Sequence, residues 1–132
     1  DERLPAMSLV LGVERNGESC SYPLVSLVED PVINDTVGGD PLVVLYNSHR
    51  DVAEVFSGRV NGRVLTFNPA ADDQSAGAVA TDTETGSTWD VTGTAVSGEL
   101  KGMSLAPLPH FNKLFWFSWA LFKPGTRVKV AA

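Results

Sequence analysis

The chain has 132 residues, of which 43% are hydrophobic and 20% are charged, a composition typical of one globular domain spanning residues 1–132. Ten Lys and Arg against sixteen Asp and Glu give a formal net charge of −6. That balance disfavours nucleic acid and anionic lipid as partners, because both attract clusters of basic side chains. The single cysteine excludes a disulfide framework and a multi-thiolate zinc site.

The first residues, Asp1–Pro5, show neither the basic nor the apolar region of a secretory signal. The chain begins with Asp rather than Met, as a processed mature protein or a piece of a longer one would. No run of about 18 apolar residues, the length that spans a bilayer, occurs in the sequence.

The dipeptide Asn16-Gly17 predicts a β-hairpin, because both residues tolerate the positive φ angles of a type I′ turn. A two-residue loop also fixes the register of the two strands. Cys20 then faces an apolar neighbour, and we expect it to be a small buried hydrophobe rather than a reactive thiol. The predicted cross-strand pairs are Arg15 with Glu18, Val13 with Cys20, and Leu11 with Tyr22.

Further elements follow Pro23, which ends the second strand. Leu24–Val28 is a short apolar run that fits one helical turn, and Val32–Asn34 fits a short strand. Leu42–Tyr46 is apolar throughout, which is typical of a strand buried on both faces.

A second Asn-Gly dipeptide, at Asn61-Gly62, predicts a hairpin between Val52–Val60 and Arg63–Asn68. Its register pairs Phe56 with Phe67, an aromatic contact that would fix the hairpin to the core. A third hairpin is predicted between Ala78–Asp82 and Ser87–Val91, with Gly86 in the left-handed conformation. Short strands are expected at Thr94–Val96 and Met103–Leu105.

One helix is expected over Phe111–Phe122, ended by Pro124-Gly125, with a last strand in Thr126–Val130. The predicted fold is therefore mainly β. We expect an antiparallel, hairpin-rich sheet or a partly closed barrel with one C-terminal aromatic-rich helix.

The predicted helix holds about half of the aromatic side chains of the chain. At 100° per residue, Phe111, Leu114, Phe115, Leu121 and Phe122 form a stripe that would pack on a sheet. The remaining large side chains leave two interpretations open: strands or the C-terminal tail cover them, or they form a docking surface for a protein or a membrane interface. The candidate partner-binding residues are Trp116, Trp119, Phe117 and Lys123.

Few residues suggest a catalytic or metal-binding site. We expect His49 to lie in a solvated loop and His110 to cap or pack against the helix. A metal-binding or redox enzyme using His49, His110 and Cys20 is the alternative. The acidic residues, among them Asp72-Asp73, do not form the Asp-x-Asp-x-Asp-Gly loop of a calcium site. We expect no cofactor.

Several segments resemble a bacterial family classed as a domain of unknown function. They occur in order along almost the whole chain, and the Asn-Asp-Thr-Val-Gly-Gly block is fairly specific. The segments are Gly17-Glu18 with Tyr22-Pro23-Leu24, Ile33 to Gly39, Asn61 to Phe67, Glu84 to Ser87 with Trp89, Thr92-Gly93 and Ala95, and Phe111-Asn112 through Phe115-Trp116-Phe117 and Trp119-Ala120 to Pro124.

The resemblance implies an extracytoplasmic protein, because members are typically secreted or anchored outside the cytoplasm. Many members carry Tyr-Cys-Pro-Leu-Cys, some with selenocysteine in the first Cys position. This chain has Tyr46-Asn47-Ser48-His49-Arg50 there, so Asn47 and Arg50 stand in place of the two Cys residues. Thiol–disulfide chemistry needs two sulfurs, and we therefore do not expect it here.

The leading hypothesis is a non-catalytic extracytoplasmic structural or accessory subunit that binds a protein partner through its aromatic helix. A membrane-associated electron-transport assembly is the host suggested by the family's redox ancestry. A third hypothesis, a carrier of a small ligand, requires a cavity.

Overall fold

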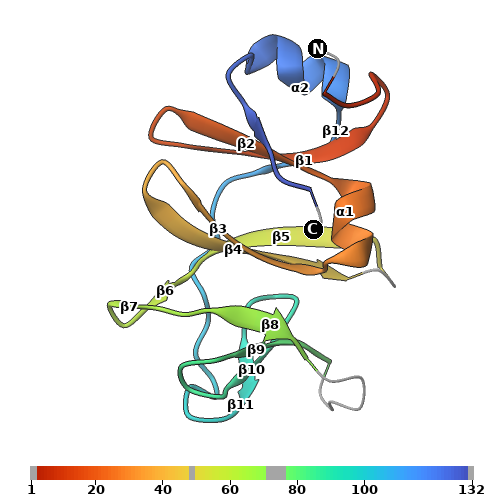
Figure 1. Cartoon of the computed structure of the whole chain (residues 1–132). Coiled ribbons are helices and arrows are strands. Elements are labelled where there is room, and N and C mark those ends of the chain that lie inside the picture. The colour runs from red at the N-terminus through yellow and green to blue at the C-terminus, as the bar shows by residue number, and fades with distance from the viewer. Residues whose placement is uncertain (1–2, 48–49, 71–76, 131–132) are drawn as a thin grey trace.

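The computed structural model describes residues 3–47, 50–70 and 77–130. His49 and Asp72-Asp73 lie outside the described residues. The strands form three stacked sheets and a small two-stranded ribbon (Figure 1). The fold is mainly β and largely antiparallel, as predicted, but the sheets do not close into a barrel.

The first sheet has the strand order β12-β1-β2-β13. Its centre is the hairpin of β1 (Leu9–Arg15) and β2 (Glu18–Pro23), and both turn residues, Asn16 and Gly17, have positive φ. The predicted register is confirmed: Leu11 lies opposite Tyr22, Val13 opposite Cys20, and Arg15 opposite Glu18.

The second sheet contains β3 (Val32–Val37), β4 (Asp40–Asn47) and β5 (Val52–Ser57) in that order. The short helix α1 (Leu24–Glu29) links the first sheet to the second. Side chains from both sheets form one core cluster, which includes Cys20 and Tyr22. Leu42–Tyr46 is buried along its whole length, as the apolar run predicted.

The third sheet has the order β11-β10-β9-β8. Its strands are β8 (Phe67–Pro69), β9 (Ala78–Asp82), β10 (Thr88–Asp90) and β11 (Ala95–Ser97). The hairpin predicted around Gly86 is confirmed, with Trp89 opposite Ala80 and Gly86 at φ 72°.

The hairpin at Asn61-Gly62 is shorter than predicted, since β6 (Arg59–Val60) and β7 (Arg63–Val64) pair over only two residues each. The predicted cross-strand pair of Phe56 with Phe67 is wrong. Phe56 lies opposite Val43 on β4, and Phe67 lies opposite Asp82 on β9. Both rings nevertheless belong to one core cluster with Trp89 between the second and third sheets.

The C-terminal helix α2 (Trp116–Phe122) begins five residues later than predicted. Phe111–Phe115 forms the strand β12, which pairs with β1 through contacts that local periodicity does not reveal. The first backbone N–H groups of the helix donate to the chain's N-terminal segment, Trp116 to Ser8 O at 2.7 Å and Phe117 to Ala6 O at 3.0 Å.

The last strand, β13 (Arg127–Val128), pairs in parallel with β2. The α2 helix, β12 and the described N-terminal residues thus gather at one end of the molecule (Figure 1). No helix of the described residues combines the length and apolar character needed to cross a bilayer.

Candidate functional site

Trp116 and Trp119 are buried, with 0% and 3% of their surface exposed. The indole N–H of Trp119 donates to the hydroxyl of Thr126 at 2.9 Å, and its ring lies against the backbone of Gly12. A Cβ at Gly12 would lie only 2.7 Å from that ring. The expectation that the two Trp rings face solvent is therefore wrong, because they hold α2 against β1.

The exposed surface of β12 and α2 carries four of the five residues that the helical pattern assigned to packing, together with Phe117; the fifth, Leu114, packs against the core cluster of Trp116 and Trp119. Of the five residues on this surface, four are Phe, and all five are between 42% and 79% exposed. The rings of Phe115 and Phe117 stack with centroids 6.0 Å apart. We call this surface the aromatic face; its residues are Phe111, Phe115, Phe117, Leu121 and Phe122.

A groove of about 360 Å³ opens on the aromatic face between Phe111 and Phe122. Leu114, Ser118 and Trp119 also line it. Lys123 stands at this groove and donates to Glu14 Oε2 at 2.6 Å. Of the four candidate partner-binding residues, Phe117 and Lys123 thus border the exposed surface.

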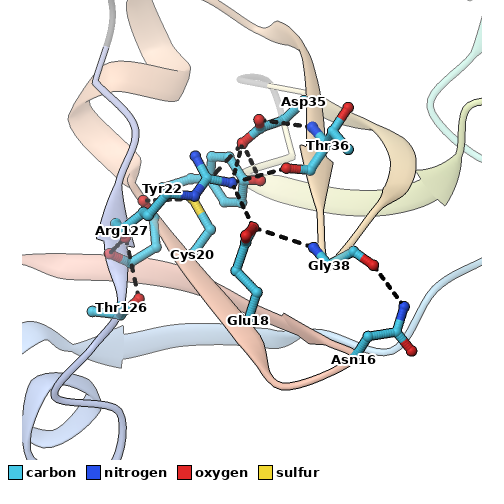
Figure 2. Close-up of polar contacts among 10 residues, drawn as sticks. Asn16, Glu18, Cys20, Tyr22, Asp35, Thr36, Gly38, Thr126 and Arg127 are labelled. Carbon is cyan, nitrogen blue, oxygen red and sulfur yellow. Dashed lines mark hydrogen bonds and ion pairs between the residues drawn. The ribbon is translucent and has the colours of Figure 1, made fainter.

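Cys20 belongs to a polar cluster inside the protein, between the first hairpin and β3 (Figure 2). Asp35 Oδ2 lies 2.9 Å from the hydroxyl of Tyr22, 3.8 Å from Cys20 Sγ and 3.6 Å from the Arg127 guanidinium. Arg127 also pairs with Glu18 at 3.2 Å. Sequence reasoning missed this cluster, because no local pattern connects positions so far apart along the chain.

Its buried position makes Cys20 a poor nucleophile. Burial is the main reason that the pKa of the Cys20 thiol rises from 9.0 to about 11. Burial also raises the pKa of the Tyr22 hydroxyl. Because the thiolate is the reactive and metal-binding form, a thiol with this pKa stays inert at neutral pH. The geometry supports the prediction that Cys20 is structural.

Within the described residues, no three His, Cys, Asp or Glu side chains are arranged so that they could hold a metal ion. His110 faces Glu54, with its Nε2 3.6 Å from the carboxylate, and its Nδ1 lies 2.9 Å from the carbonyl of Leu108. This contact anchors the segment that leads into β12, which agrees with a packing role for His110.

Asn47 and Arg50 flank the connection between β4 and β5. The backbone N–H of Arg50 donates to Asn47 Oδ1 at 3.3 Å. Asp51 accepts hydrogen bonds from Tyr46 at 2.8 Å and Lys113 at 2.7 Å, and these two partners lower the pKa of its carboxyl group. The side chains at positions 47 and 50 can hold a turn and bind an anion, but they cannot exchange a disulfide.

The Asn34-to-Gly39 block, which carries much of the family resemblance, connects several elements of the fold. The Asn34 side chain donates to the Phe67 carbonyl at 2.7 Å and accepts from its N–H at 2.8 Å, which joins β3 to β8. A Cβ at Gly38 would collide with the carbonyl oxygen of Arg15. The block thus fixes the packing of the sheets.

Comparison with known proteins identifies the family of the chain but no characterised relative. No curated protein and no solved structure matches the chain. The family described as "Protein of unknown function (DUF3179)" matches residues 1–126, almost the entire sequence. The chain therefore belongs to the DUF3179 family.

Proposed function

We propose that this chain is a non-catalytic, extracytoplasmic accessory module that binds a protein partner through its aromatic face. The observation that carries the proposal is the exposure of five large apolar side chains on β12 and α2. Contiguous apolar patches on soluble proteins commonly mark interaction sites, and aromatic residues are enriched there.

The aromatic face has two parts, one around Phe117 and one around the groove. Phe115 stacks on Phe117, and Leu121 stands one helical turn after Phe117 on the same side of α2. Phe111 and Phe122 line the groove at the other side of this surface. The groove offers a pocket for an apolar anchor of the partner, the usual centre of binding energy in an interface.

The charge around this face indicates the chemistry of the partner. Lys113 belongs to β12, and Lys123 directly follows α2. Lys113 and Lys123 make exposed ion pairs with Asp51 and Glu14. Exposed pairs of this kind contribute little, so a partner's carboxylates can replace them. We expect a protein surface with an apolar centre and an acidic rim.

A non-catalytic role is supported by the burial of Cys20 and by Asn47 and Arg50 at the positions where similar chains carry a Cys-x-x-Cys pair. The extracytoplasmic setting, and a membrane-associated electron-transport assembly as host, are supported by the resemblance to that family.

The experiment compares two matched variants in the native host. In the first, Phe117, Leu121 and Phe122 are changed to Ser. In the second, Val25 and Val28, which are 76% and 60% exposed on α1, are changed to Ser. Wild type and the α1 variant should elute from gel filtration in a complex larger than the monomer, whereas the α2 variant should elute as a folded monomer. Equal elution of all three proteins would contradict the proposal.

A further inference from the structure

We propose that a second groove, between β5 and the third sheet, binds a small organic carboxylate with an apolar body. This groove has a volume of about 550 Å³, within the range of roughly 300–1,000 Å³ common for ligand sites. It is separate from the aromatic face, so the proposal does not depend on protein binding. Its apolar lining consists of Val52, Phe56, Val91, Leu105 and Pro107.

One wall of the groove is built on β5. Every second residue of β5 points to the same face of the strand. The residues at these positions, Val52, Glu54 and Phe56, all line the groove. The segment that contains Pro107 runs beside the strand and is held by two backbone hydrogen bonds. Ser57 N donates to Ala106 O at 2.8 Å, and Leu108 N donates to Val55 O at 2.9 Å.

The facing wall is a turn between β10 and β11. Asp90 Oδ1 accepts hydrogen bonds from the backbone N–H of Thr92 at 3.0 Å and from its hydroxyl at 2.6 Å. Gly93, at φ 81°, allows the Phe56 ring to approach, because a Cβ there would lie 2.7 Å from the ring. Both walls are thus fixed before a ligand arrives, which lowers the entropy cost of binding.

The positive charge of Arg50 at the groove favours a ligand with a carboxylate. Arg50 lines it at the end where β5 begins. The neighbouring carboxylate, Asp51, is already engaged by Tyr46 and Lys113, and Glu54 faces His110. Among the described residues, no carboxylate forms an ion pair with the Arg50 guanidinium within 4.0 Å.

A guanidinium that no described carboxylate pairs with, beside apolar walls, matches a ligand with a carboxylate at one end. The planar fork of Arg binds a carboxylate through two parallel hydrogen bonds, and the apolar walls accept the rest of the molecule. The hydroxyls of Thr92 and Ser104 line the same groove and can hydrogen-bond to polar atoms of the ligand.

The test uses 3-phenylpropanoate as the probe and 3-phenylpropanamide as its uncharged analogue. Amide chemical shifts of the ¹⁵N-labelled protein are followed during titration. We expect saturable shifts at Val52, Thr92 and Leu105 with the carboxylate. The amide should bind about tenfold more weakly or worse, because it loses the charge-assisted hydrogen bonds.

Arg50→Gln should reduce the affinity for 3-phenylpropanoate by about tenfold or more. Arg59 is exposed on strand β6, and Arg59→Gln should leave the affinity unchanged and serves as the matched control. Absence of saturable shifts in the wild type, equal affinity of carboxylate and amide, or unchanged affinity in Arg50→Gln would each overturn the proposal. None of these results bears on the aromatic face.

Discussion

The hydroxyl of Tyr22 donates a hydrogen bond to Asp35 Oδ2 at 2.9 Å and thereby joins the first hairpin to β3. The Tyr22 side chain is completely buried, and the same carboxylate oxygen faces Cys20 and Arg127 (Figure 2). One carboxylate thus faces donors from two strands of the first sheet, β2 and the chain's last strand β13. It lies in the block that carries the family resemblance, which gives that block a physical role.

Tyr22→Phe should lower the free energy of unfolding by about 1–2 kcal/mol, because it removes a buried hydrogen bond and leaves Asp35 with fewer donors. Urea denaturation measures the change. Tyr46→Phe is the matched control, since its hydroxyl bonds to Asp51, a half-exposed carboxylate that Lys113 also holds. A loss in Tyr22→Phe no greater than in the control would contradict the role of this contact.

Cys20 should react slowly with a thiol reagent such as a disulfide dye in the native protein and rapidly after unfolding. The reason is that the thiol is buried and its pKa is raised to about 11, so little thiolate is present or accessible at neutral pH. Cys20→Ala should cost about 1–2 kcal/mol of stability as a lost buried group. Native labelling at the rate of the unfolded chain would refute the structural assignment.

Stability should fall at alkaline pH. The pKa of Cys20 rises from 9.0 to about 11 on folding, so the folded state keeps a proton that the unfolded state releases. The stabilisation is complete below the unfolded pKa and is lost as the pH rises through the folded pKa. Between about pH 8 and about pH 10.5 the wild type should lose about 2 kcal/mol more than Cys20→Ala, measured by denaturant titration. Parallel losses in both proteins would show that the thiol is not responsible.

Trp119→Ala should destabilise the fold by about 3–5 kcal/mol, because the ring fills the space above Gly12 and bonds to Thr126. Phe122→Ala, on the same helix but 77% exposed, should change stability by less than about 1 kcal/mol. Thermal or urea unfolding distinguishes the two. Similar small effects for both variants would place the Trp ring outside the core.

Local signals predicted the features that depend on local chemistry. The Asn16-Gly17 turn fixed which residues of β1 and β2 face each other, because a two-residue loop leaves one register. The register predicted from the second Asn-Gly turn is confirmed for Val60 with Arg63, and the backbone N–H of Leu65 donates to Gly58 O at 2.8 Å, but the predicted pair of Phe56 with Phe67 is wrong. There, β5 pairs with β4 and β8 pairs with β9, and these contacts come from elsewhere in the chain.

The candidate site was predicted in part for the same reason. Composition identified the aromatic segment, and Phe117 is exposed as expected. The two Trp rings are buried, whereas most of the stripe expected to pack on a sheet is exposed. The reason is that Phe111–Phe115 forms a strand that pairs with β1 and does not belong to the helix. The resulting seven-residue helix turns its Trp rings toward β1, where Gly12 leaves room for Trp119. A helical wheel of the segment cannot show its pairing with β1 or the space at Gly12, because both depend on a distant part of the chain.

The most direct test of the proposed function is site-specific photo-crosslinking in the native host. A benzophenone amino acid replaces Phe117 on the aromatic face in one protein and Val25 on α1 in the other; the two native side chains are 51% and 76% exposed. We predict one discrete protein adduct from position 117 and none from position 25. No adduct at position 117, an adduct with lipid alone, or the same adduct from both positions would contradict a protein-docking role for the aromatic face.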